Sequence, residues 1–257
     1  MSQKELEYLQ EKYKQREEDS LLKKIPDEAY LCIRLDGFHA TKNHLKNVVT
    51  NKNFTNGLSN AHYKLFCSFR HYLNRDYTSS IVSSFMANDE ISIILNKDND
   101  NYDKRIMKLC TLFSGVLSSA ATLDLNKKNK KDVGIVAFDS RPILLYSIDE
   151  ISEYVRSRYL ISKRYAYWKV LRLNNIPEVN EDYIKKSIDN SMNLAKENNL
   201  LKDAQKIISS YKFFLPEQTI KPNYKTFVTN DKNMAIDEIK TMLGSYLEYL
   251  HSTKRTI

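Results

Sequence analysis

Apolar residues recur along this chain in two periods, and together the two periods predict an α+β fold. Runs rich in β-branched residues alternate with segments whose apolar residues lie three or four positions apart, the spacing of one helical face. The predicted strands are Tyr30–Leu35, the runs on either side of Asn88-Asp89-Glu90, Val133–Asp139 and Ile143–Tyr146, where Pro142 is expected to interrupt the ladder. The long helices between them are predicted at Asn56–Arg75 and Tyr102–Leu123.

The resulting order is strand, helix, strand, strand, helix, strand, the ferredoxin-like arrangement that polymerase palms and nucleotide cyclases also have. We therefore expect a palm-like antiparallel sheet over residues 26–147, preceded by a charged helical segment over residues 1–25. Residues 148–257 are predicted to form a helical region that packs on this sheet. Its expected elements are helices at Asp149–Leu173, Glu181–Glu197, Leu201–Phe213 and Asp231–Leu250, with a loop and an extended piece at Leu215–Val228.

Two acidic motifs stand where strands of this sheet are expected to end. The first predicted strand stops at Asp36-Gly37, and two alternating apolar runs meet at Asn88-Asp89-Glu90, which is typical of a hairpin tip. Carboxylate oxygens on neighbouring strand ends are ligands that hard divalent cations prefer. Because a pair of such metals can stabilise both the attacking and the leaving oxygen of a phosphoryl transfer, nucleotidyl transfer is the first hypothesis.

Composition narrows the partners and the compartment. The formal charge of +8 over 257 residues favours a polyanionic partner such as nucleic acid. The five glycines form neither GxGxxG nor GxxxxGK[ST], so metals and basic side chains would have to hold the phosphates of a nucleotide. Three widely spaced cysteines, a charged N-terminus and the lack of an apolar run near about 20 residues predict a cytoplasmic protein that does not cross a membrane.

The predicted helix after Asp149 combines positive and aromatic side chains. Between Tyr154 and Arg172, lysines and arginines are interleaved with tyrosines and a tryptophan. Cations can neutralise phosphates, while aromatic faces can stack on unpaired bases. An amphipathic helix with aromatic residues in the core and charges in solvent gives the same pattern, so both interpretations stay open.

Taken in order, these motifs resemble those of the tRNA-His guanylyltransferase family and of its relatives, the reverse (3′–5′) RNA polymerases. Ile33–Gly37 followed by Phe38-His39 resembles the first strand motif of the family, and Asn88–Ser92 resembles its acidic hairpin. Val136–Arg141 resembles its Phe-Asp-x-Arg strand, and Arg158 lies where the family has a motif-rich helix. The resemblance covers about residues 29–214 by order of elements.

The resemblance implies a metal-dependent nucleotidyltransferase that adds nucleotides to the 5′ end of tRNA, with GTP or ATP as substrates. It implies catalytic roles for Asp36, Asp89 and Glu90, and two Mg²⁺ ions held by Asp36, Asp89 and the backbone oxygen of Gly37. The residues implied in nucleotide binding are Phe38, His39, Lys42 and Asn88, and those implied in binding RNA or triphosphate are Arg158, Lys163 and Arg164. A homo-oligomer, a tetramer by resemblance, is also implied.

Two departures from the family pattern bear on the substrate. Phe38 follows Gly37 directly where the family usually has extra residues, and Lys163–Lys169 replaces a motif of histidine and asparagine. The replacement favours a divergent relative with a different RNA substrate, such as a template-dependent polymerase that repairs truncated tRNA 5′ ends. Two further interpretations stay open, a nucleotide cyclase on the same fold and a non-catalytic RNA-binding protein.

Overall fold

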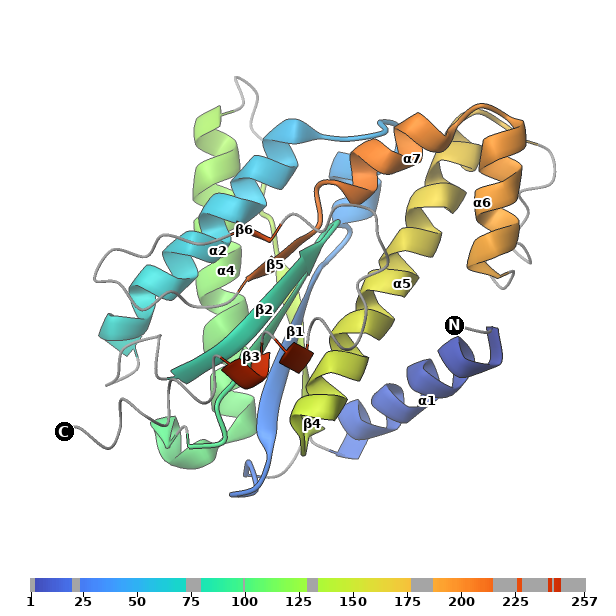
Figure 1. Ribbon diagram of the computed structural model, residues 1–257. Helices are drawn as coiled ribbons and strands as arrows, with labels where there is room; N and C mark the ends of the chain where they lie inside the picture. The colour runs from blue at the N-terminus through green and yellow to red at the C-terminus, as the bar shows by residue number, and fades with distance from the viewer. Residues whose placement is uncertain are drawn as a thin grey trace.

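The strands of the protein, taken from a computed structural model, are β1 (Tyr30–Gly37), β2 (Ile81–Ala87), β3 (Glu90–Leu95), β4 (Phe138–Leu145), β5 (Lys212–Phe214) and β6 (Thr226–Phe227). They form one antiparallel sheet in the order β4-β1-β3-β2-β5-β6 (Figure 1). The structure describes residues 3–19, 24–72, 80–98, 100–128, 134–176, 187–214, 226–227, 240–241 and 243–245.

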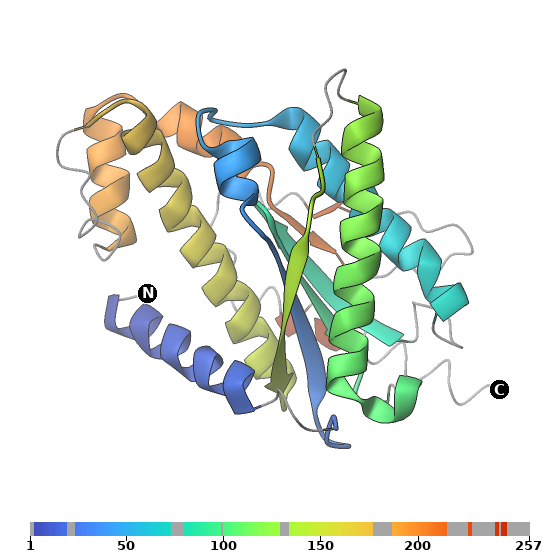
Figure 2. The same ribbon diagram turned by 180° about the vertical axis from the view of Figure 1, so that it is seen from behind.

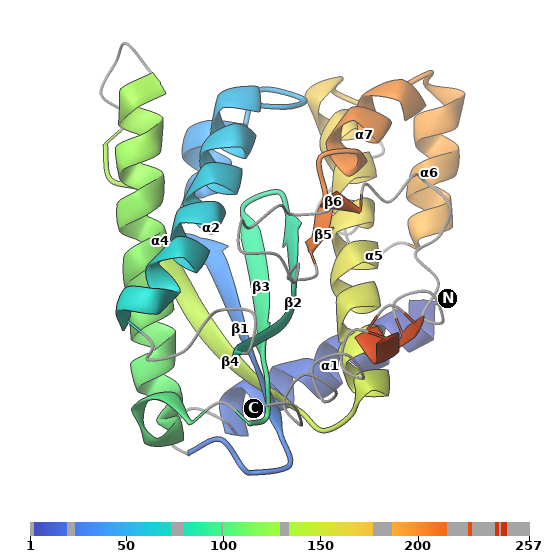
Figure 3. The same cartoon turned by 60° about the vertical axis from the view of Figure 1, so that its left-hand side comes forward.

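Helices cover both faces of this sheet. They are α1 (Gln3–Asp19), the short turns η1 (Thr41–Leu45) and η2 (Asn101–Lys104), α2 (Lys52–Tyr72), α4 (Ile106–Lys128), α5 (Ile148–Leu173), α6 (Ile188–Glu197) and α7 (Leu201–Ile208). Helices α2 and α4 pack on one face, whereas α5 and α1 pack on the other, and α6 and α7 lie against α5 (Figures 1 and 2). The sheet is therefore the middle layer between two helical layers (Figure 3).

The two helical layers explain why the central strands are apolar on both sides. In β1, Leu31, Ile33 and Leu35 belong to the core under α2 and α4, whereas Tyr30 and Cys32 belong to the core under α5. Because side chains alternate along a strand, the same parity directs Arg34 and Asp36 toward α5. The end of β1 thus presents a carboxylate on the face of the sheet that α5 covers.

The predicted strand and helix order, β-α-β-β-α-β, is the order that the structure has from β1 to β4. The expected interruption at Pro142 was wrong, because β4 runs through it and Pro142 lies opposite Ile33. Strand β4 is at the edge of the sheet, so half of its N–H groups face away from the ladder, and an edge strand tolerates a residue without an N–H group.

The C-terminal half differs more from the prediction. The helix expected at Leu201–Phe213 ends at Ile208, and β5 then extends the sheet by pairing with β2. The extended piece expected within Leu215–Val228 contains β6, which pairs with β5. The helix predicted at Asp231–Leu250 lies mostly outside the described residues, as does the start of the one predicted at Glu181–Glu197.

Helix α1, which the sequence predicted, is fixed to α5 by charge as well as by packing. Leu9 and Tyr13 are buried in the core under α5, and the guanidinium of Arg16 donates two hydrogen bonds to the carboxylate of Glu150, at 2.6 and 2.7 Å. Ser147 caps α5 by accepting a hydrogen bond from the Glu150 N–H group at 3.1 Å. One acidic side chain at the start of α5 therefore anchors the N-terminal helix.

Helix α4 is more apolar than we expected from the sequence. Over 106–127 this helix is long and apolar enough to cross a membrane by length and composition alone. Its inward side chains, including Leu109, Phe113 and Leu117, are buried in the core against the sheet and α2. A core helix passes the same test of length and composition, so the finding is weak evidence for a membrane segment.

Two glycines in these helices make a matched pair for testing the packing of α2 on α4. A Cβ atom on Gly57 would lie 2.7 Å from Cδ2 of Leu125, whereas one on Gly115 would meet no atom within 4 Å. We expect Gly57→Ala to lower the free energy of unfolding by about 1 kcal/mol through overpacking. Gly115→Ala is expected to raise it by up to about 1 kcal/mol, because alanine favours the helix. Urea unfolding of both variants checks this; equal shifts would contradict it.

Candidate active site

The two predicted acidic motifs meet at one end of the sheet. Asp36 of β1 lies opposite Glu90 of β3 in the antiparallel register, which brings the end of β1 beside the β2–β3 turn that contains Asp89. The Gly37 N–H group donates a hydrogen bond to the carbonyl oxygen of Asp89 at 3.0 Å. Because this bond joins Asp89 to the residue that follows Asp36, it makes the carboxylates of Asp36 and Asp89 neighbours.

This contact requires glycine at position 37. A Cβ atom there would lie 2.7 Å from Cβ of Ala40 and 3.1 Å from Cβ of Asp89. Both neighbours are Cβ atoms rather than the ends of flexible side chains, so any larger residue would push the backbones apart. Gly37 thus permits the backbone at the end of β1 to approach that of Asp89 closely. This is a structural reason for glycine here, in addition to the metal contact that the resemblance implies.

The residues after Gly37 fold back and hold Asp89 from its other side. His39 has a φ of 55°, which reverses the chain, and η1 follows directly. From the first residue of η1, the Thr41 hydroxyl donates a hydrogen bond to Oδ2 of Asp89 at 2.9 Å. The Asp89 carboxylate is thereby oriented toward the region between the sheet and η1.

Burial, and repulsion from neighbouring carboxylates, disfavour the charged forms of both Asp36 and Asp89. Burial, with the nearby carboxylates of Glu90 and Asp89, raises the pKa of Asp36 to about 6. Burial also raises the pKa of Asp89, although the hydrogen bond from Thr41 opposes the shift. Two acids that resist ionisation side by side form a site that a divalent cation would stabilise.

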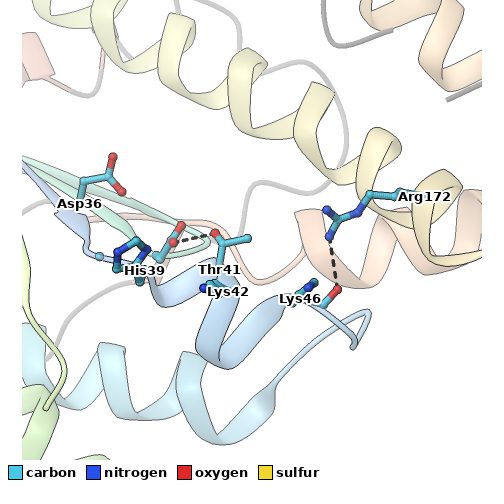
Figure 4. A pocket seen from close by; sticks show the side chains of 8 residues that line it. Asp36, His39, Thr41, Lys42, Lys46 and Arg172 are labelled. Atoms are coloured by element: carbon cyan, nitrogen blue, oxygen red, sulfur yellow. Dashed lines mark hydrogen bonds between the residues drawn. The ribbon is translucent and has the colours of Figure 1, made fainter. Parts of the chain in front are cut away.

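An open cavity of about 420 Å³ lies next to these carboxylates (Figure 4). Its lining residues are Asp36, Gly37, His39, Thr41, Lys42, Lys46, Asp89 and Arg172. Arg172 reaches toward η1 from the end of α5 and donates a hydrogen bond to the carbonyl oxygen of Lys46 at 3.4 Å. The cavity is therefore acidic where β1 and the β2–β3 turn end and basic where η1 and α5 meet.

The other predicted residues of the acidic hairpin have partners outside the cavity. Glu90 is buried and receives two hydrogen bonds from the Arg158 guanidinium, one of them 2.8 Å from Nε to Oε1. The side-chain oxygen of Asn88, at the left-handed position of the turn, accepts a hydrogen bond from the Tyr211 hydroxyl at 3.3 Å. Both residues shape the turn that presents Asp89.

The basic residues expected to meet triphosphate are not those that line the cavity. Arg158 is paired with Glu90, and Lys163 is buried with its ammonium 5.9 Å from the centre of the Tyr159 ring. On a helix with 3.6 residues per turn, Lys163 and Arg164 lie about 140° and 120° around the axis from Arg158. Lys42 was predicted and does line the cavity, and Arg172, which also lines it, was named only among the cations of the predicted helix. Thr41 and Lys46 were missed as site residues. Phe38 is 63% exposed, with its ring 4.1 Å from that of His39.

The donor set fits magnesium better than a metal with an all-protein cage. Within the described ranges, no group of three or more His, Cys, Asp or Glu side chains is arranged to hold a metal ion. Mg²⁺ is usually bound through one or two carboxylates together with waters and substrate phosphates. Asp36 and Asp89 offer two such carboxylates, and their charge is only partly balanced by Arg34 and Lys169.

The strand order β4-β1-β3-β2 is that of a ferredoxin-like sheet, and Asp36 and Asp89 meet at one end of it. A family model described as tRNAHis guanylyltransferase (Thg1) matches residues 10–146, more than half of the chain. The chain belongs to the tRNAHis guanylyltransferase family. Membership supports nucleotide addition to tRNA of the guanylyltransferase type.

Solved structures show the same fold at low sequence identity. A bacterial Thg1-like protein in complex with ATP is 15% identical with a TM-score of 0.65, over 93% of this chain and 97% of that chain. A bacterial Thg1-like protein in complex with GTP is 13% identical with a TM-score of 0.59, over 91% of this chain and 98% of that chain. The tRNA(His) guanylyltransferase of Saccharomyces cerevisiae is 19% identical with a TM-score of 0.60, over 84% of this chain and 95% of that chain. No curated protein matches the chain.

The raised pKa of Asp36 predicts a pH-dependent stability in the absence of divalent metal. Because the folded-state pKa of about 6 exceeds the ordinary value of 3.8, the folded state keeps its proton longer than the unfolded state. This contribution is fully present below about pH 4 and is lost as the pH rises through about 6. Allowing for partial exposure, we expect wild type to lose about 2 kcal/mol relative to Asp36→Asn between pH 4 and 7.5.

Urea unfolding of both proteins at several pH values, without and with Mg²⁺, measures this difference. Magnesium should recover most of the loss in wild type and little in Asp36→Asn. Parallel pH profiles without metal would contradict the prediction.

Because the Glu90–Arg158 pair is buried, we predict that it contributes to the stability of the fold. Arg158→Met leaves a buried carboxylate without its main partner and should cost about 3 kcal/mol of unfolding free energy. The double variant Glu90→Gln/Arg158→Met should recover a large part of that loss. Denaturant unfolding of Arg158→Met, Glu90→Gln and the double variant checks the coupling; additive losses from the two single changes would show that the pair does not act as a unit.

Proposed function

We propose that this protein is a metal-dependent nucleotidyltransferase that adds nucleotides to the 5′ end of tRNA, in the 3′–5′ direction. The observation that carries the proposal is the junction at Gly37, which places Asp36 and Asp89 together on one wall of a cavity with Lys42, Lys46 and Arg172 on the other. Carboxylates that bind metal, facing cations that bind phosphate, are what a triphosphate-dependent transfer requires.

In the proposed reaction, the 3′-hydroxyl of an incoming nucleotide attacks the first phosphate of a triphosphorylated RNA 5′ end, and pyrophosphate leaves. Asp36, Asp89 and the Gly37 carbonyl would hold two Mg²⁺ ions. The bound metal would supply activation of the hydroxyl and stabilisation of the leaving pyrophosphate. Thr41 orients Asp89 for this role, and Lys42, Lys46 and Arg172 would bind the phosphates.

His39 and Phe38 are proposed to contact the base or ribose of the nucleotide. His39 lines the cavity, and the exposed Phe38 ring beside it provides an aromatic surface on which a base can stack. The contacts that Asn88, Arg158 and Lys163 make inside the fold support a positioning role for them instead. Arg164, half-buried beside α1, would meet RNA only outside this cavity.

We propose that the three segments expected from the sequence have different roles. Residues 26–147 would carry the carboxylates, and residues 148–257 would add Arg172 and support the sheet, with residues 1–25 bracing α5. The cytoplasmic location, expected from the composition, and the homo-oligomeric state, implied by the resemblance, stay predictions.

Nucleotide addition should depend on Asp89 and Asp36 far more than on a nearby exposed carboxylate. The assay uses Mg²⁺, labelled NTPs and tRNA transcripts with a 5′-triphosphate or 5′-monophosphate, either intact or lacking the first nucleotide. Asp89→Asn should lower the rate of 5′ growth by at least about 100-fold, because a metal ligand is lost. Asp139→Asn is the matched control, because Asp139 lies opposite Asp36 in the sheet but is half-exposed and paired with Arg141.

The reaction products distinguish guanylation from repair, from cyclisation and from RNA binding without catalysis. Several nucleotides added opposite template bases would favour tRNA 5′-end repair over guanylation. NTP turnover without RNA would favour a cyclase, and a nucleotide affinity that does not respond to Mg²⁺ would favour a non-catalytic RNA-binding protein. Full activity of Asp89→Asn would overturn the proposed site.

A further inference from the structure

Lys169, near the end of α5, is a buried cation that the proposed chemistry has not yet used. Its side chain is only 2% exposed. A lysine is almost never buried to this extent unless an anion pairs with it. No carboxylate within the described ranges lies at ion-pair distance from its ammonium group, since none of the ion pairs found there includes Lys169.

Lys169 does not itself line the cavity, but two residues next to it do. Its electrostatic neighbours are Asp89, which belongs to the acidic wall, and Arg172, which belongs to the basic wall. Burial, and then repulsion from Arg172, lower its pKa to about 8, and attraction to Asp89 opposes them. The ammonium group is therefore buried beside one carboxylate, that of Asp89, which lies beyond ion-pair distance.

Helical geometry puts Lys169 in line with the residue of α5 that lines the cavity. Tyr165, Lys169 and Arg172 are spaced four and three residues apart, so they share one face of the helix. The Tyr165 ring lies near Thr41 and Asp89, and the Arg172 guanidinium is stacked 4.7 Å from the centre of the Trp168 ring. This stacking holds the guanidinium plane while leaving most of its five N–H donors for a ligand.

We propose that Lys169, together with Arg172, binds the phosphate chain of the nucleotide, so that the missing counter-ion of Lys169 is a non-bridging phosphate oxygen. This inference rests on the proposed function and assigns the phosphate subsite within it. A triphosphate chelated by metal at Asp36 and Asp89 would bring its oxygens between the carboxylate wall and the α5 face. Lysine and arginine suit such an anion because they offer charged donors from one direction.

The alternative is that Lys169 only neutralises Asp89 in the metal-free protein. The two roles differ in what they do to ligand affinity. A pure counter-ion competes with metal, so its removal would strengthen Mg²⁺ binding and would not distinguish a triphosphate from a monophosphate. A phosphate ligand contributes to triphosphate affinity and leaves nucleoside monophosphate binding nearly unchanged.

The test measures equilibrium binding of GTP and ATP, and of GMP and AMP, to the full chain with Mg²⁺ and without RNA. Lys169→Met should weaken triphosphate binding by about 10- to 100-fold, the effect of losing a hydrogen bond to a charged group. Monophosphate binding should change by less than about threefold. Lys169→Arg should recover most of the triphosphate affinity, because it keeps the charge and its reach.

Lys212→Met is the matched control. Lys212 is also a lysine whose pKa burial lowers, but it lies on β5 and donates to the Ser59 hydroxyl at 3.1 Å, on the α2 side of the sheet. It should leave triphosphate affinity unchanged, and thermal unfolding would verify that both methionine variants fold. Equal losses for triphosphate and monophosphate, or unchanged triphosphate affinity with tighter Mg²⁺ binding, would overturn the proposal.

The outcome is separable from that of the proposed function, because RNA is absent from the binding assay. Selective loss of triphosphate affinity would support the subsite even if no 5′ addition to tRNA were found. Conversely, 5′ addition by wild type with unselective binding changes in Lys169→Met would support the function and reject the subsite.

Discussion

The site depends on one close backbone approach, between the end of β1 and the β2–β3 turn. The Gly37 N–H group meets the Asp89 carbonyl at 3.0 Å, and no side chain fits between the two backbones. That approach forces two carboxylates into one partly buried volume, although each resists ionisation there. The β1–β3 register maintains the approach, and its cost must be balanced by apolar burial on both faces of the sheet.

The electrostatics of the cavity follow from that constraint. Acids that cannot move apart need cations, and the structure supplies them from η1 and α5 at a distance rather than as direct partners. Direct ion pairs would satisfy the carboxylates and leave nothing for a metal to gain. The pairing of Glu90 with Arg158 shows the contrast, since that carboxylate is fully engaged and stands outside the cavity.

The acidic half of the site and the order of the first four strands were predictable, because both are local features of the sequence. A strand that stops at Asp-Gly and a hairpin that turns at Asn-Asp-Glu place their carboxylates without knowledge of the rest of the chain. The basic half was not predictable in this way. Choosing Arg172 over Lys163 requires the rotation of α5, which is set by contacts with residues far away in sequence. Strand β5 was missed for the same reason. The apolar spacing of this segment also fits a helix, and only its pairing with β2, which is distant in sequence, makes it a strand.

The buried Glu90–Arg158 pair is one of the contacts that fix the rotation of α5, together with the apolar side chains that this helix buries in the core. Arg158 lies within about 60° of arc of Tyr165, Lys169 and Arg172 on a helix with 3.6 residues per turn. Arg158 is bound to Glu90, the first residue of β3. This contact therefore favours a rotation in which Tyr165, Lys169 and Arg172 also face the sheet, along about 21 Å of helix between Arg158 and Arg172. A buried ion pair adds little net stability, but it can select one arrangement among several of similar apolar burial. Glu90 thus helps to orient the helix that carries Lys169 and Arg172, although its own carboxylate lies outside the cavity.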